Sequence, residues 1–521
     1  MSAPWTRRSF LQATGAASTQ LGGFASLLAK CPGLLQDPKV TPELVRLGPD
    51  IEPLVRLIEA TPLERCFEVF AAQLRAGLPY RQLMAALFLT GIRNFKSAST
   101  GAMHSVFLMH SVHQFSLDAR PEDRLLPLFF ALDNLVTYRE QVAKSGPHEP
   151  LLPLQGTLPA AAAASDEFRA AMDDWDGERA DRAMVVLLRT RGMAEIGEHL
   201  WPYAARDQNH IGHKAIFVAN AWRTLQAIGW QHAEPVLRAL SLALVSYHMR
   251  YAKAARERFD QQPYLANVER VREMKGQLPV DWAGTGGDAG PTHEVLALLH
   301  DGRTNDACAL AASLLRDGKA RAGALWDAVH LGAAELMMRQ PGIDGVHAVT
   351  SSNALHFCFR ASGRTESRLL ILLQAIGWLG LFHATMAERG LHLVHITELT
   401  PGEVPADEVA AAREVLAEPP FTGSLARGGS WTAAAGPAKA FRCAQLFPEA
   451  EALCAQARQL IFRKATEEHE YKFPAAIFED YRLVDARWRP HMLAAAVYFL
   501  RNASEPDSPV MQRAREALGV K

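Results

Sequence analysis

One short pattern recurs along the 521-residue chain, and each copy begins with a histidine. The clearest copies start at His104, His213 and His347. Each has an apolar residue two positions later, then a small residue at the seventh position with an apolar residue behind it. A looser fourth copy starts at His469, and successive copies lie 109, 134 and 122 residues apart. Similarity at such a period indicates a fold built from repeated units.

Each copy lies between two stretches with the apolar periodicity of an amphipathic helix. The stretches before the histidines are 83–92, 184–199, 325–338 and 454–463, and those after are 125–135, 235–247, 369–379 and 492–500. Pro474 interrupts the fourth copy, because proline removes a helical hydrogen bond and clashes with the preceding turn. We therefore predict an all-α fold of four helical pseudo-repeat units, packed around a central pocket, at 38–145, 166–262, 292–397 and 438–503.

Composition excludes several classes of protein. The chain is 49% hydrophobic and 21% charged with a net charge of −1, as in an ordinary globular protein. It has no basic stripe for nucleic acid and no run of eighteen apolar residues, so we predict no membrane span. The best strand signal, 391–396, is short. The six cysteines have no metal-site spacing and are predicted to be small buried hydrophobes.

Residues 1–35 leave two interpretations open. The sequence Thr6-Arg7-Arg8-Ser9-Phe10 resembles a twin-arginine export signal, but the stretch behind it is only weakly apolar. An export signal predicts a periplasmic protein, whereas a flexible arm is compatible with a cytoplasmic one. The twin-arginine route carries folded proteins, so export would be consistent with a cofactor loaded beforehand.

The repeated histidines are the candidate site. If four units surround one centre, the imidazoles of His104, His213, His347 and His469 can meet there as metal ligands, since neutral imidazole commonly binds iron, copper and zinc. Iron and haem are both open as cofactors. So are direct catalytic roles for His213, His347 and His469, and a structural role in which each imidazole only bonds a backbone carbonyl. Glu-x-x-His spacing does not occur in two copies, which argues against a ferritin-like di-iron centre.

Lys472 is a further candidate catalytic residue, three positions after His469 and among acidic residues. A lysine is a compact positive charge that can stabilise a developing oxyanion on a substrate. The alternative is a surface ion pair with Glu468, which would contribute little to stability.

Three groups of residues resemble, in this chain order, motifs of the questin oxidase-like family. They are His213-x-x-Ile216 with Ala221-x-Arg223-x-Leu225, His347-Ala348-Val349-Thr350 with Ala354-Leu355, and Glu468-His469-x-x-Lys472 with Ala475. The chain departs from the family pattern in lacking a glycine after His213 and His347. The resemblance would cover about residues 60–500.

The resemblance implies an oxidoreductase that consumes oxygen and NADPH to oxidise an aromatic or polyketide-like small molecule, as a monooxygenase does. The chain has no flavin or nicotinamide fingerprint, so a metal on the repeated histidines would have to account for oxygen activation. Two alternatives stay open: a non-catalytic haem- or ligand-binding helical protein, and a helical-repeat scaffold. No protein partner is indicated.

Overall fold

The computed structural model describes residues 45, 47–94, 100–144, 150–246, 262–423 and 431–520. The arginine pair near the N-terminus lies outside these residues, as does Cys31. The first half of the fold contains α2 (Glu52–Ala60), α3 (Cys66–Arg75), α4 (Tyr80–Asn94), α5 (Thr100–Leu117), α6 (Leu126–Lys144), α7 (Ala164–Asp173), α8 (Gly177–Thr190), α9 (Met193–Ala204), α10 (His213–Ile228) and α11 (Ala233–Ser246).

The second half is also helical and adds one small hairpin. Its helices are α12 (Gln262–Glu273), α13 (Ala289–His300), α14 (Thr304–Arg316), α15 (Ala322–Arg339), α16 (Ile343–Ala361), α17 (Thr365–Ala387), α18 (Glu408–Val415), α19 (Gly436–Leu446), α20 (Glu451–Lys464), α21 (His469–Leu483), α22 (Arg489–Ala496) and α23 (Pro509–Leu518). Strands β1 (Phe421–Gly423) and β2 (Trp431–Ala433) pair antiparallel. Short 3-10 turns lie at Leu63–Arg65, Trp230–His232, Ile396–Glu398, Ala486–Trp488 and Val497–Phe499. The all-α prediction is confirmed.

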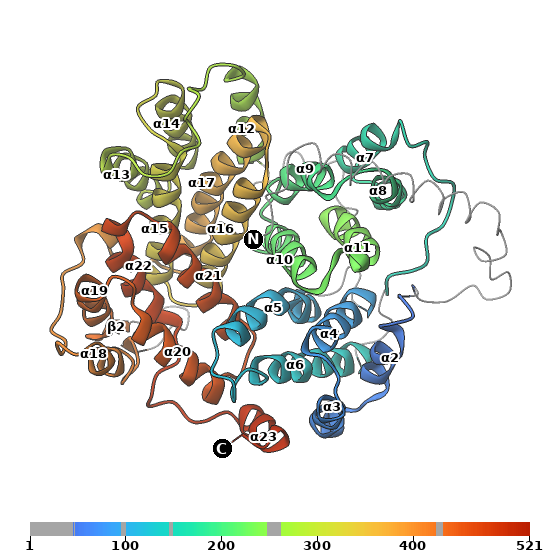
Figure 1. The fold of residues 1–521 in the computed structure, drawn as a ribbon. Coiled ribbons are helices and arrows are strands. Elements are labelled where there is room, and N and C mark those ends of the chain that lie inside the picture. The colour runs from blue at the N-terminus through green and yellow to red at the C-terminus, as the bar shows by residue number, and fades with distance from the viewer. Residues whose placement is uncertain are drawn as a thin grey trace, which may run out of the picture.

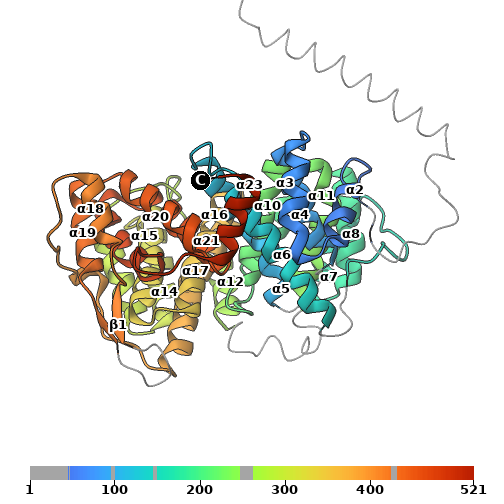
Figure 2. The same cartoon turned by 90° about the horizontal axis from the view of Figure 1, so that it is seen from below.

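Four helices at the middle of the molecule form a closed ring of contacts. Helix α5 packs against α10, α10 against α16, α16 against α21, and α21 back against α5. In Figure 1 the other helices of the first half lie on one side of this group, and those of the second half except α23 lie on the other; Figure 2 shows the same division from below. The last helix, α23, packs against α3 and α6 and so ties the end of the chain to its beginning.

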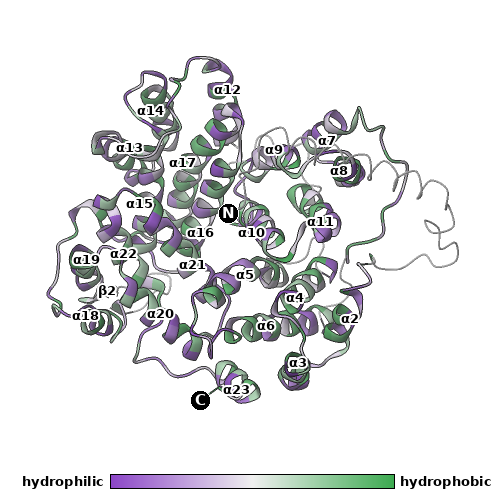
Figure 3. Ribbon diagram, viewed as in Figure 1, coloured by the Kyte–Doolittle hydropathy of each residue, from purple (hydrophilic) through white to green (hydrophobic). Residues whose placement is uncertain are grey.

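Apolar side chains fill the spaces between helices. Figure 3 shows hydrophobic residues concentrated on helix faces that turn toward other helices and hydrophilic residues on the outer faces. Helix α17 is the one described helix that is long and apolar enough to cross a membrane, and 83% of its apolar stretch is buried inside the fold. The five described cysteines are free and buried, as predicted.

Three local predictions were wrong. The stretch 391–396 is not a strand, because its backbone N–H groups donate to partners outside any sheet. The His392 N–H donates to the carbonyl of Arg339, and the Ile396 N–H donates to the carboxylate of Glu335. The stretch 184–199 is divided between α8 and α9. Pro474 does not interrupt a helix, since α21 runs through it to Leu483.

Candidate metal centre

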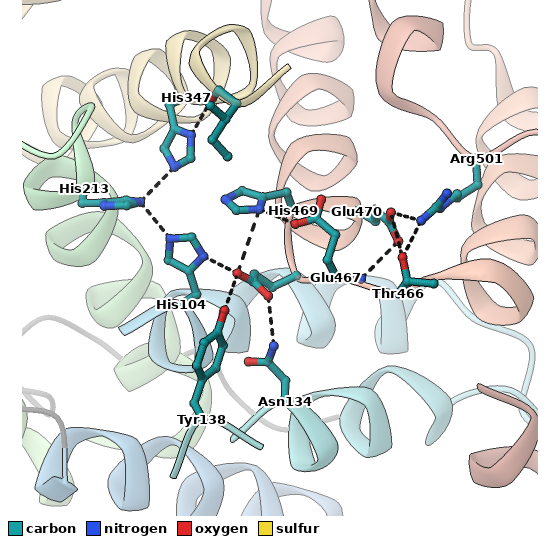
Figure 4. Close-up of polar contacts among 12 residues, drawn as sticks. His104, Asn134, Tyr138, His213, His347, Thr466, Glu467, His469, Glu470 and Arg501 are labelled. Carbon is teal, nitrogen blue, oxygen red and sulfur yellow. Dashed lines mark hydrogen bonds and ion pairs between the residues drawn. The ribbon is translucent and has the colours of Figure 1, made fainter. Parts of the chain in front are cut away.

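The four predicted histidines meet where the four central helices begin. His213 and His469 are the first residues of α10 and α21, while His104 and His347 are the fifth residues of α5 and α16. Figure 4 shows their rings facing one common space. All four residues are between 1% and 7% exposed. The convergence that the sequence predicted is therefore present, and the four-fold repeat itself stays a prediction.

Three imidazole nitrogens of this group, which we call the histidine cluster, lie in direct contact. The Nε2 atom of His213 is 3.0 Å from Nε2 of His104 and 2.8 Å from Nε2 of His347. The three atoms all lie within 4.8 Å of one another. A metal with two imidazole ligands at right angles, at bonds of about 2.1 Å, would hold their nitrogens roughly 3 Å apart. The observed separations match that arrangement.

In His104 and His347, the hydrogen bond made by Nδ1 shows that the ring proton is on Nδ1 and not on Nε2. Nδ1 of His104 lies against the carboxylate of Glu468 and donates to it (Figure 4). Nδ1 of His347 donates to the carbonyl of Ile343 at 2.7 Å. A neutral imidazole carries one proton, so both rings present an Nε2 lone pair to His213. Such a second partner is usual for histidines that bind metals.

His469 presents a further lone pair to the same space. Its Nδ1 donates to Glu467 at 2.6 Å, and its Nε2 is buried without a hydrogen-bond partner among the described residues. The ring centroid of His469 lies 4.6 Å from that of His104 and 5.0 Å from that of His347. His469 therefore adds a fourth neutral imidazole beside the three Nε2 atoms.

Glu468 connects the histidine cluster to α6. Besides His104, its carboxylate accepts hydrogen bonds from the Tyr138 hydroxyl and the Asn134 amide, both at 3.0 Å. Burial, together with the Glu468 charge, raises the pKa of Tyr138, so the phenol keeps its proton. These bonds hold the carboxylate in place and thereby orient the His104 ring.

All four imidazoles are held neutral. Burial is the largest cause of their lowered pKa values, and the Lys472 ammonium lowers all four further. Neighbouring imidazoles also lower the pKa values of His104, His213 and His347. The pKa of His469 falls to about 3. The four helix N-termini act in the same direction, because each carries partial positive charge. Neutral imidazole is the form that binds a metal ion.

Lys472 lies beside the histidine cluster and not on the surface. Its side chain is 4% exposed, and its ammonium has no hydrogen-bond partner in the part of the chain that the structure describes. Burial lowers its pKa to about 8, although the charges of Glu468 and Glu467 oppose this shift. The alternative of a surface ion pair with Glu468 was therefore wrong. A buried cation with three free donors can instead bind an anionic oxygen.

A left-handed turn sets the position of His213. His210, Ile211 and Gly212 have φ values of 52°, 52° and 85°. A Cβ atom on Gly212 would lie 2.5 Å from Cβ of Ser351 on α16. Only glycine allows α10 to begin this close to α16, and such strained backbone is concentrated at functional sites.

The remaining histidines of the repeated segments lie elsewhere. His110 lines a separate cavity, and Nδ1 of His113 bonds the Tyr80 hydroxyl at 3.1 Å. His356 bonds His330 at 2.8 Å and stacks on the indole of Trp326. The three histidines of α5 therefore do not share one site.

Sequence reasoning missed the residues that orient the imidazoles. Glu467 and Glu468 directly precede His469, and this pair of acids was the available signal. Asn134 and Tyr138, four residues apart on α6, lie some thirty residues beyond His104 and carry no recognisable motif. Comparison of the chain with protein-family models, curated proteins and solved structures finds no match.

Proposed function

We propose that the chain is a metal-dependent oxidoreductase of the questin oxidase-like kind. In this proposal His104, His213 and His347 hold a first-row transition metal ion, iron in the first place, through their Nε2 atoms. Its substrate would be an aromatic or polyketide-like small molecule. The class of reaction comes from the motif resemblance, and the metal comes from the geometry of the histidine cluster.

One observation carries the metal proposal: Nε2 of His213 faces two lone pairs. His104 and His347 both have their proton on Nδ1, so without a metal a single N–H of His213 would have to serve both Nε2 atoms. Its own Nδ1 is buried without a partner among the described residues. A metal ion would use all three lone pairs at once, and histidine nitrogens suit iron, copper and zinc.

The spacing of the rings favours a single ion over a haem. Neighbouring ring centroids lie 4.6–5.0 Å apart around the histidine cluster, which leaves no room for a porphyrin between them. A purely structural role is disfavoured because His469 Nε2 and Lys472 Nζ are both buried without hydrogen-bond partners among the described residues. Each buried polar atom without a hydrogen bond lowers the stability of the fold by about 1–3 kcal/mol, and a purely structural role would give nothing in return.

The side chains around the proposed ion have separate tasks. The metal would supply Lewis acidity and redox chemistry when bound. The neutral imidazole of His469 can accept a substrate proton at Nε2, since its Nδ1 proton is held by Glu467. The Lys472 ammonium can hold an anionic substrate oxygen. Because the centre is buried, water is excluded and these charges act more strongly.

Metal analysis of the purified full-length chain tests the proposal. We expect about one equivalent of a transition metal per chain, and its loss in His213→Ala and in His347→Ala. His113→Ala is the matched control, because this histidine lies on α5 outside the histidine cluster and should leave the metal content unchanged. Protein that binds no metal after incubation with Fe(II), or metal retained equally in all three variants, would contradict the proposal.

Glu468→Gln separates orientation of a ligand from packing. The amide preserves the size of the side chain but removes the charge that holds the His104 proton on Nδ1. We expect metal affinity to fall by about 10- to 100-fold, as is usual for second partners of metal-bound histidines. The melting temperature of the metal-free variant should change little.

Oxygen uptake tests the class of reaction. The metal-loaded protein should consume oxygen with a panel of hydroxylated aromatic compounds, and the role of NADPH is tested by its omission. Oxygen uptake that is unchanged by His347→Ala would show that the chemistry occurs elsewhere.

A further inference from the structure

A cavity lies beside three of the four helices that carry the histidine cluster, α5, α10 and α21. It has a volume of about 330 Å³ and is lined by residues of α5, α10, α20 and α21. That volume is at the lower end of the range for small-molecule sites. Six residues of α5, about 9 Å along the helix axis, separate its His110 from His104. Phe107 packs against the rings of His104 and His213 between them.

The cavity carries one positive charge without a carboxylate partner. The guanidinium of Arg223 donates to both carboxylate oxygens of Glu479, at 2.8 and 2.9 Å. The guanidinium of Arg458 lies 3.2 Å from the carboxylate of Asp118. The guanidinium of Arg482 has no carboxylate within ion-pair distance among the described residues and donates only to the carbonyl of Phe478. The two acids of the lining are therefore neutralised, and Arg482 is left to bind an anion.

His110 adds a free imidazole to the cavity. No hydrogen bond joins it to another of the described residues, and its side chain is partly exposed to the cavity. Burial and the neighbouring Arg223 charge lower its pKa well below the usual value, so the ring is neutral and offers one donor and one acceptor. The remaining walls include the rings of Phe115 and Phe478, which are 5% and 8% exposed. Aromatic walls favour a flat apolar body over an inorganic ion.

We propose that this cavity binds a small aromatic carboxylate, with the carboxylate on Arg482 and His110 and the ring between the phenylalanines. The proposal does not depend on the metal, because the histidine cluster contributes no residue to the cavity lining. It is a separate binding site of this chain.

Binding of 2-naphthoate and its neutral amide, 2-naphthamide, tests the proposal by calorimetry on the full-length chain. We expect saturable binding of the carboxylate and weaker binding of the amide. Arg482→Gln should weaken 2-naphthoate about tenfold, as expected for loss of a hydrogen bond to a charged group, and leave the amide unchanged. Arg482 is exposed, so this variant should fold.

Two further variants complete the design. Arg272→Gln removes an exposed guanidinium from α12, which packs against α17 and does not line the cavity, and should leave binding unchanged. Ala475→Phe fills the cavity from α21 and should abolish binding of both ligands. No saturable binding of 2-naphthoate, equal affinities for acid and amide, or an effect of Arg272→Gln as large as that of Arg482→Gln would overturn the proposal. Binding of 2-naphthoate should persist after the protein has been treated with a chelator. This result is expected whether or not the histidine cluster binds a metal.

Discussion

Buried acids show how strongly the interior of this fold disfavours charge. Asp327 on α15 is 6% exposed and accepts a hydrogen bond from the backbone of Asp485 at 3.1 Å. Burial raises its pKa to about 6, against an ordinary value of 3.8. A pKa that is raised on folding stabilises the fold below the unfolded pKa, and this contribution is lost as pH rises through 6.

Asp327→Asn should therefore stabilise the protein at alkaline pH. The amide oxygen can still accept the Asp485 N–H, and no charge has to be buried. We expect a gain of up to about 3 kcal/mol in the free energy of unfolding at pH 8, which vanishes near pH 4. Denaturant unfolding at both pH values measures it. Asp166→Asn on the exposed face of α7 should show no such pH dependence, and a gain at pH 4 as large as at pH 8 would contradict the assignment.

At the residue scale, the sequence predicted the imidazoles but not the groups that orient them. His104, His213, His347 and His469 could be found because they repeat within helical segments. The His347 proton is held by the Ile343 carbonyl four residues earlier on α16, whereas the His104 proton is held by Glu468, which only the packing of α5 against α21 brings into place. The burial of Lys472 depends on how α21 packs, so it could not be predicted from the acidic residues beside it in the sequence.

The turn that precedes α10 determines where this helix begins and therefore where His213 lies. Helix α10 begins after a left-handed turn that ends at Gly212, and α16 passes close to it. Gly212→Ala should destabilise the fold by about 1–3 kcal/mol, because alanine is strained at this φ and its Cβ would collide with Ser351. Displacement of His213 should also lower the metal content.

Gly390→Ala is the matched control for this element. Gly390 has a φ of 94°, and a Cβ there would meet no atom within 4 Å. The Gly390→Ala variant should have a lower melting temperature, because alanine is strained at this φ, but it should retain its metal. Equal metal loss in both variants would mean that the turn before α10 does not position the site.

Apolar periodicity predicted the helical stretches that flank the histidine segments, such as those of α4, α6, α15 and α17, whereas it did not predict that α21 continues through Pro474. Periodicity could not show that the apolar stretch 391–396 lacks a neighbouring strand, since this depends on bonds from Arg339 and Glu335 of α15. It also could not show the hairpin of β1 and β2, which lies in a stretch rich in small residues.

The proposed metal would connect both halves of the molecule. Helices α5 and α10 belong to the first half and α16 and α21 to the second, and the histidine cluster lies where they meet. Chelation should therefore lower the melting temperature, since a ligand that binds only the folded state stabilises it, by about 4 kcal/mol at 1,000 times its dissociation constant. Scanning calorimetry before and after chelation, and after metal is restored, measures this. A melting temperature that is unaffected by either step would contradict the prediction.

The four histidines of the central helices emerge from the ribosome at different times during synthesis of the chain. Three of them leave the ribosome well before His469, and Glu468, which orients His104, emerges with that last histidine. At 5–20 residues per second, roughly six to twenty-five seconds separate His347 from His469. The complete binding geometry can thus arise only near the end of translation, so an ion captured earlier would meet a partial set of ligands.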